Sequence, residues 1–251
     1  MTLNQFTFEH IHNAGLVASA TDTYIHYHLP DMPLYYDSNY IAFKKMPTVS
    51  EFQKAEQTLK IYHSVRDQHH LKFTFPENEP IPKEVKAYLN RNDYDTGFLE
   101  LYVLDPKDFP EVLPSADVQV SLVTADNLKE LLHLHRIIDE QFGKEFAAQK
   151  QKMHIKNFSD PNVVQLVAHC DKELAGTVDL IVNEQTVEID GLYVLVEMRH
   201  RGIGTQLQRW LINQYPDKLV ILVADGEDTP KEMYQRQNYN YISYQYETVK
   251  T

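Results

Sequence analysis

Residues 199–204, with the sequence Arg-His-Arg-Gly-Ile-Gly, have the residue types and spacing of a loop that holds phosphate. They lie between a strand-like run, Val187–Val194, and a helix-like run, Thr205–Tyr215. The first N–H groups of a helix have no intrahelical acceptor, and the helix dipole makes this end positive. Glycine lets the backbone approach an anion without a Cβ in the way, and arginine supplies paired donors that suit phosphate. The chemistry expected here is therefore the binding of a phosphorylated ligand at the start of a helix.

Two common phosphate loops do not fit this segment. A dinucleotide fingerprint requires a third glycine where this chain has Leu207, and a P-loop requires lysine after the second glycine, where Thr205 follows Gly204. The pattern Arg-x-x-Gly-x-Gly instead resembles the acyl-CoA pyrophosphate loop of the GCN5-related N-acetyltransferase (GNAT) superfamily. The resemblance covers the C-terminal half, from about Val118 to the end. It implies the GNAT acyl-CoA N-acyltransferase fold, with acetyl-CoA as cosubstrate.

The strand before the loop is predicted to contain a β-bulge. Its apolar residues take odd positions as far as Ile189 and even positions from Leu192, whereas side chains in a regular strand alternate strictly. One extra residue at Asp190–Gly191 restores the alternation. In the family that the loop resembles, the bulged strand splays from its neighbour and its backbone pairs with the pantetheine arm, a role that falls here on Leu192 and Val194. One departure is Val196, where many family members have proline.

By resemblance, the cofactor-binding residues run from the end of this strand through the first turn of the helix. They are Leu192, Tyr193, Val194, Arg199, His200, Arg201, Gly202, Ile203, Gly204 and Thr205.

A short helix near the C-terminus carries the predicted acid. Thr229-Pro-Lys-Glu232 is a capping box with proline at the first helical position, and Asn238 is predicted to end the helix in the left-handed conformation. The segment resembles the family's Tyr-x-x-x-Gly-Phe ending, with Asn238 for glycine and Tyr239 for phenylalanine. The resemblance implies that Tyr234 protonates the departing thiolate. The alternative is that its ring only packs against the sheet.

Acetyl transfer to an amine also requires a neutral nucleophile. Deprotonation at pH 7 costs about 1–1.4 kcal/mol for a peptide α-amine and about 4.6 kcal/mol for lysine. A general base acting through water is therefore expected, and Glu188 and Asp190 are the candidates because they share one face of the strand before the bulge. Either could instead be a solvated strand residue.

Composition restricts the class of protein. The chain has 251 residues, 43% of them hydrophobic, and no long apolar run, which predicts a soluble globular protein. Its first ten residues lack the features of a signal peptide, and the single cysteine, Cys170, suits the reducing cytoplasm as a buried apolar residue. The net charge of −12 argues against nucleic-acid binding and suits a cationic amine substrate. A cytoplasmic enzyme without nucleic-acid or membrane partners is expected.

Three histidine pairs could place two ligands on one side of a strand: His10-x-His12, His26-x-His28 and His133-x-His135. No cysteine or carboxylate cluster accompanies them to complete four ligands. They are interpreted as solvated or half-buried structural residues, and no metal is expected.

Three prolines mark Asp105–Asp117 as a linker, which predicts two domains, residues 1–114 and 115–251. The fold class expected is α/β (α+β): a mixed twisted sheet with flanking helices, preceded by a smaller GNAT-like strand–helix–strand module. That first half reads as strand, helix, strand, helix and strand, in this order: Asn39–Lys44, Ser50–His69, Leu71–Phe75, Pro82–Asn90 and Gly97–Leu104. The same order ends the second half, so the first is interpreted as a degenerate, partial GNAT repeat. It has no Arg-x-x-Gly-x-Gly and should not bind CoA.

The function expected is acetyl-CoA-dependent N-acetylation of a small amine, either an amino acid or the α-amine of a short peptide. Two alternatives stay open: a protein acetyltransferase acting on N-termini or lysines, and a non-catalytic acyl-CoA-sensing module. The acceptor itself is not identified by the sequence. A tyrosine-rich terminal strand (Tyr239, Tyr241, Tyr244, Tyr246) could pair with another sheet edge, so a homodimer is considered.

Overall fold

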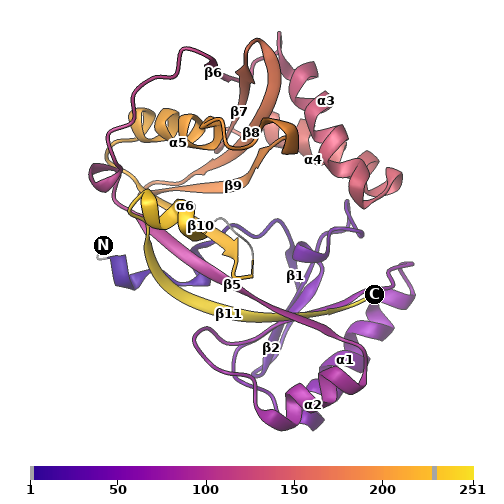
Figure 1. Ribbon diagram of the computed structural model, residues 1–251. Helices are drawn as coiled ribbons and strands as arrows, with labels where there is room; N and C mark the ends of the chain where they lie inside the picture. The colour runs from indigo at the N-terminus through magenta and orange to yellow at the C-terminus, as the bar shows by residue number, and fades with distance from the viewer. Residues whose placement is uncertain (1–2, 228–230) are drawn as a thin grey trace. The chain divides into compact units, whose positions relative to one another are not determined.

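The computed structural model describes residues 3–227 and 231–251 (Figure 1). It is a mixed α/β structure, as predicted, with a large mixed sheet and flanking helices. The chain forms two compact units, and neither is continuous in sequence. The first contains the chain up to Tyr102, with Val223–Lys231 and Tyr241–Thr251; the second contains Val103–Leu222 and Glu232–Asn240.

Within the first unit the strand order is β1-β2-β3-β4-β11-β5. The strands are β1 (Leu16–Ala20), β2 (Tyr24–His28), β3 (Tyr40–Phe43), β4 (Leu71–Thr74), β5 (Asp95–Leu104) and β11 (Asn240–Lys250). β3 and β4 are parallel, whereas β2 pairs antiparallel with β1 and β3, and β11 pairs antiparallel with β4. The predicted order of strand, helix, strand, helix and strand is confirmed for β3 to β5; β1 and β2 were not predicted.

Helices α1 (Val49–Ser64) and α2 (Lys83–Arg91) cover the core of this unit. α1 begins at a capping box: the Thr48 side chain accepts from the N–H of Glu51, and the Glu51 carboxylate accepts from the N–H of Thr48 at 2.8 Å. Its buried residues recur at helical spacing: Phe52, Ala55, Leu59 and His63. The first three pack in one core cluster with the phenylalanines of β3 and β4.

Within the second unit the strand order is β10-β9-β8-β7-β6. The strands are β6 (Val118–Leu122), β7 (Val163–Cys170), β8 (Glu173–Val182), β9 (Thr186–Val194) and β10 (Leu219–Asp225). β6 to β9 form an antiparallel meander, and β10 joins β9 in parallel. The helices are α3 (Leu128–Asp139), α4 (Lys144–Phe158), α5 (Ile203–Gln214) and α6 (Lys231–Arg236).

Helices cover both faces of this second sheet. Figure 1 shows α5 on one face of β6–β9 and α3 with α4 on the other. The predicted helical region 127–158 is divided because Gly143 has a φ of +109°, a backbone conformation that interrupts a helix. Cys170 is buried at the end of β7, as predicted.

The segment predicted to be a linker packs against α5. The side chain of Arg209 donates to the carbonyl of Val112 at 2.8 Å, and the amide of Gln206 donates to the carbonyl of Leu113 at 2.9 Å. Gln206 is buried beneath this segment. The predicted domains divide the chain once, at residue 114. The first compact unit instead ends at Tyr102 and also includes residues 241–251, which form most of β11.

The position of β11 removes the basis for the homodimer considered above. β11 lies between β4 and β5 in the first unit, so both of its edges face strands of the same chain. The tyrosine-rich strand therefore cannot add to a sheet edge of a second copy.

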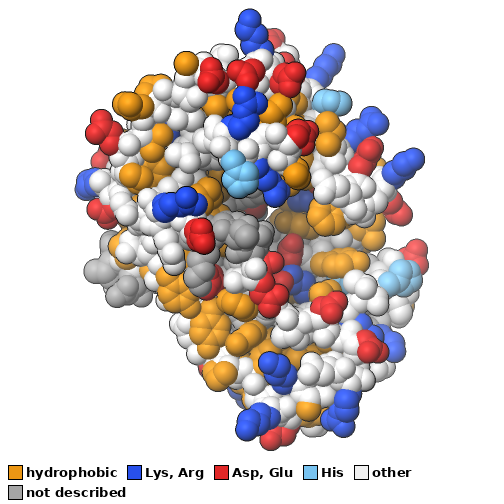
Figure 2. All heavy atoms as spheres, viewed as in Figure 1, with side chains coloured by type: hydrophobic (Ala, Val, Ile, Leu, Met, Phe, Trp, Pro, Cys, Tyr) orange, Lys and Arg blue, Asp and Glu red, His pale blue; other side chains and the backbone are white. Residues whose placement is uncertain are grey.

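No helix among residues 3–227 and 231–251 combines the length and apolar character needed to cross a membrane. Acidic and basic side chains are interspersed over the face shown in Figure 2.

Candidate functional site

The bulge predicted in β9 is present. Between two consecutive register pairs, Thr177↔Tyr193 and Asp179↔Asp190, β8 advances by two residues and β9 by three. The extra residue lies beside Gly191, which has a φ of +63°. The sequence located this irregularity correctly because the apolar pattern changes face there.

Before the bulge, β9 pairs in parallel with β10, from Thr186↔Leu219 to Glu188↔Ile221. Beyond the bulge, β9 continues to Val194 and remains paired with β8.

The two candidate bases lie on the face of the sheet that α3 and α4 cover. Asp179 of β8 accepts from Asn157 of α4 at 3.1 Å, so its side chain points to that face. Asp190 is its register partner on β9, and register partners share a face. Glu188, two residues away, shares it too, so the prediction that the two carboxylates lie on one side is confirmed. Glu188 is buried and Asp190 half-buried.

The glycine loop forms the N-terminus of α5, on the opposite face. Gly202, with a φ of +78°, is the N-cap residue, and His200 also has a positive φ of +63°. α5 begins at Ile203, and the N–H of Gln206 donates to the carbonyl of Gly202 at 3.0 Å. The N–H groups of residues 203–205 precede that bond in the helix, so the predicted loop does lie at a helix N-terminus; that it binds an anion stays a prediction.

Both arginines of the loop already contact other groups. Arg199 Nε donates to the carbonyl of Val194 at 3.3 Å, and its guanidinium lies 5.9 Å from the centre of the Tyr193 ring. Arg201 forms an ion pair with Asp171 in the β7–β8 turn, and this carboxylate raises the pKa of Arg201. Both guanidinium groups are therefore held by neighbouring groups of the second unit.

Two glycines bring the loop close to the sheet. A Cβ added at Gly204 would contact Leu192 and Val194 side chains at 3.6 and 3.9 Å, so this residue faces the end of β9. Gly176 of β8 is tighter: its Cβ would lie 2.8 Å from the carbonyl oxygen of Tyr193 and 3.2 Å from Ile203 Cγ2. The sequence analysis did not single out Gly176, because the close approach is visible only in three dimensions.

Replacing Gly176 with alanine is expected to lower the free energy of unfolding by about 1–3 kcal/mol, because a backbone oxygen must move to accept the Cβ. Urea unfolding followed by circular dichroism measures this. Gly97→Ala is the matched control, since nothing lies within 4 Å of a Cβ built there. Equal stability of the two variants would contradict the close approach.

The acid candidate Tyr234 is buried on α6, with its ring edge-on to Tyr239 at 5.5 Å. Asn238 has a φ of +63° and ends the helix in the left-handed conformation, as predicted. The amide of Gln237 donates to the hydroxyl of Thr205 at 3.3 Å, which joins the end of α6 to the first turn of α5. The capping residues Thr229 and Pro230 lie outside the described residues.

The sequence-predicted residues therefore lie at three places in the second unit: the loop with the end of β9, the carboxylates of β9, and Tyr234 on α6. The sequence analysis missed four supporting residues: Asp171, Gly176, Asp179 and Gln237. A signal existed for Asp179, because an acidic residue in an apolar strand needs buried donors, here Gln165 and Asn157.

Family models match both halves of the chain. Residues 6–102 match a domain of unknown function (DUF5613), and residues 131–239 match the acetyltransferase (GNAT) family. A search of curated proteins gave no match.

Solved structures extend the similarity over the whole chain. A functionally unknown conserved protein from Staphylococcus epidermidis ATCC 12228 is 33% identical, with a TM-score of 0.91 over 99% of both chains. A GCN5-related N-acetyltransferase from Kribbella flavida is 14% identical, with a TM-score of 0.64 over 94% of this chain and 89% of that one. A tandem GNAT protein from the clavulanic acid biosynthesis pathway is 12% identical, with a TM-score of 0.52 over 84% and 74%. The last two show a shared fold.

Proposed function

Residues 131–239 form a GNAT acetyltransferase domain, and on that premise we propose that the chain transfers the acetyl group of acetyl-CoA to the primary amine of a small substrate, an amino acid or a short peptide. The GNAT fold supports an acyl-CoA N-acetyltransferase in general. The observation that supports the proposed cosubstrate site is the left-handed Gly202 at the start of α5, in the segment that follows the bulged β9.

The diphosphate of the cosubstrate is proposed to sit on the N–H groups of residues 201–205, with Arg199 and Arg201 beside it. Leu192, Tyr193 and Val194 would supply the backbone that pairs with the pantetheine arm. Since Val194 C=O accepts from Arg199, that side chain must share or leave this acceptor on binding.

Glu188 or Asp190 is proposed to take the proton of the attacking amine through water, on the face that α3 and α4 cover. The carbon–nitrogen bond forms as the carbon–sulfur bond breaks, and Tyr234 donates a proton to the departing thiolate. The net charge of −12 favours approach of a cationic amine.

The loop is tested by replacing Gly202 with alanine. The variant is expected to bind CoA at least about tenfold more weakly, because the Cβ strains the left-handed residue and obstructs the anion. Isothermal titration calorimetry measures the dissociation constant. Gly143→Ala is the matched control: Gly143 also precedes a helix with a positive φ and has open space around its Cβ position. The control should lose stability and keep its CoA affinity. Equal weakening in both variants, or no CoA uptake by the natural chain, would remove the proposal.

The acceptor class is decided by CoA thiol release with a panel of free amino acids, dipeptides and peptides with a free lysine. Turnover with amino acids or dipeptides supports the proposal. Turnover confined to protein N-termini or lysine peptides indicates a protein acetyltransferase, and tight CoA binding without turnover indicates an acyl-CoA sensor.

A further inference from the structure

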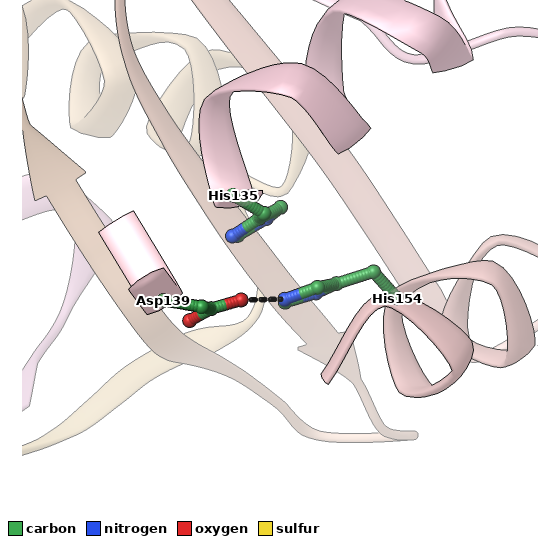
Figure 3. A group of neighbouring side chains, drawn as sticks. All are labelled: His135, Asp139 and His154. Atoms are coloured by element: carbon green, nitrogen blue, oxygen red, sulfur yellow. Dashed lines mark hydrogen bonds and ion pairs between the residues drawn. The ribbon is translucent and has the colours of Figure 1, made fainter. Parts of the chain in front are cut away.

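Three polar side chains are buried together between α3 and α4, within the second unit (Figure 3). His135 and Asp139 lie one turn apart on α3, and His154 lies on α4. Their exposed fractions are 7%, 5% and 5%. One ring nitrogen of each histidine and one carboxylate oxygen lie within 4.8 Å of one another. Figure 3 shows the two rings face to face, with Asp139 beside their edges.

The protein itself satisfies this group only in part. His154 Nε2 lies 3.3 Å from Asp139 Oδ2, but among the described residues His135 Nε2 and His154 Nδ1 have no hydrogen-bond partner. A buried polar atom without a partner destabilises the folded chain, whereas a bound ligand would satisfy it. The rings stack with centroids 3.5 Å apart and an interplanar angle of 13°. The Nε2 of His135, unpartnered among the described residues, is therefore a nitrogen that a bound ligand could use.

We propose that His135, Asp139 and His154 bind a divalent transition-metal ion of the zinc type, with a water molecule as fourth ligand. Two imidazoles and one carboxylate are a ligand set that zinc accepts, whereas calcium and magnesium prefer oxygen ligands throughout. Zinc–ligand distances of about 2.0–2.2 Å require the three donor atoms to approach within about 3.5 Å of one another. The proposal therefore requires the two imidazole rings to rotate out of their stack, so that their nitrogens approach Asp139 together.

The ion would join the two helices that cover the carboxylate face of the sheet. His154 lies three residues before Asn157, whose amide donates to Asp179 of β8. The site is distinct from the glycine loop, which lies on the other face of the sheet. It also departs from the sequence-based expectation: His133, the other member of the pair, is exposed, and the remaining ligands come from the next turn and from α4.

The test uses the full chain without a polyhistidine tag, after removal of metals by a chelator. Titration with zinc chloride in a calorimeter should give one ion per chain. The melting temperature should rise by about 5–10 °C when free zinc is about a hundredfold above its dissociation constant. Bound Co²⁺ should give the visible spectrum of a four-coordinate ion.

Two variants test whether Asp139 is a zinc ligand. Asp139→Asn keeps the shape of the side chain and removes its charge, and should weaken zinc binding at least tenfold. His133→Gln, on the exposed side of α3, should bind as the natural chain does. No zinc uptake, equal affinity in the natural chain and Asp139→Asn, or a six-coordinate Co²⁺ spectrum would each overturn the proposal. If Asp139→Asn does not fold, the stoichiometry and the Co²⁺ spectrum of the natural chain decide alone.

Discussion

Tyr234→Phe is expected to lower kcat for acetyl transfer by about 10²–10⁴-fold, the usual contribution of a positioned general acid. The variant loses the phenolic proton and keeps the aromatic ring, which is buried and packs edge-on against Tyr239. CoA affinity should stay within about twofold, because the diphosphate contacts proposed above come from the α5 loop. Stopped-time assays of CoA thiol release measure kcat, and calorimetry measures the affinity.

Tyr239→Phe is the matched control. It makes the same chemical change on the neighbouring ring, whose hydroxyl donates to Gln208 at 2.8 Å. Loss of that buried hydrogen bond should cost about 1 kcal/mol of stability and leave kcat nearly unchanged. If Tyr239→Phe reduced kcat as strongly as Tyr234→Phe, the acid role of Tyr234 would be wrong and packing would explain both effects.

Acidification is expected to destabilise the first unit between about pH 6.5 and pH 4. Burial, and then the charges of His63, His28 and Arg66, lower the pKa of His26 from 6.5 to about 4. Burial likewise lowers the pKa of His70 to about 4, although its hydrogen bond to the carbonyl of Asn39 opposes this.

The direction of the change in stability follows from the number of protons bound by the folded and unfolded states. A group whose folded pKa lies below its unfolded pKa binds more protons when unfolded, so its stabilisation is complete above pH 6.5 and lost as pH falls through 4. At about 1.4 kcal/mol per pKa unit, each ring contributes about 3 kcal/mol. The loss is large against a typical total of about 5–15 kcal/mol.

Urea unfolding at a series of pH values and constant ionic strength measures this effect. His26→Phe cannot be protonated and should remove about half of the acid-dependent loss, while its ring can keep the edge-on contact with Tyr62. His69→Gln is the control, because the His69 side chain is 84% exposed. A stability that is flat from pH 7 to pH 4, or an unchanged slope in His26→Phe, would show that these rings do not govern acid stability.

Local sequence patterns predicted the features that depend on near neighbours in the chain. The change of face at Asp190–Gly191 indicated the bulge, because strand alternation has a strict period of two. Gly202 and Asn238 both have a positive φ, one where a helix begins and the other where a helix ends. The N-terminal strand β1 was missed because all of its residues are exposed, so it carries no alternation.

Features that depend on distant segments could not be predicted in this way. Asp139 and His154 meet because the chain turns at Gly143, and no periodicity encodes that contact. Asp171 reaches Arg201 from the turn between two other strands. The roles assigned to Tyr234, Glu188 and Asp190 remain predictions, since position alone does not establish proton transfer.

The insertion of β11 between β4 and β5 has a consequence for the order of events during synthesis. Residues 71–74 emerge from the ribosome long before residues 247–250, with which they pair. The sheet of the first unit therefore cannot be completed until residues 247–250 have been translated.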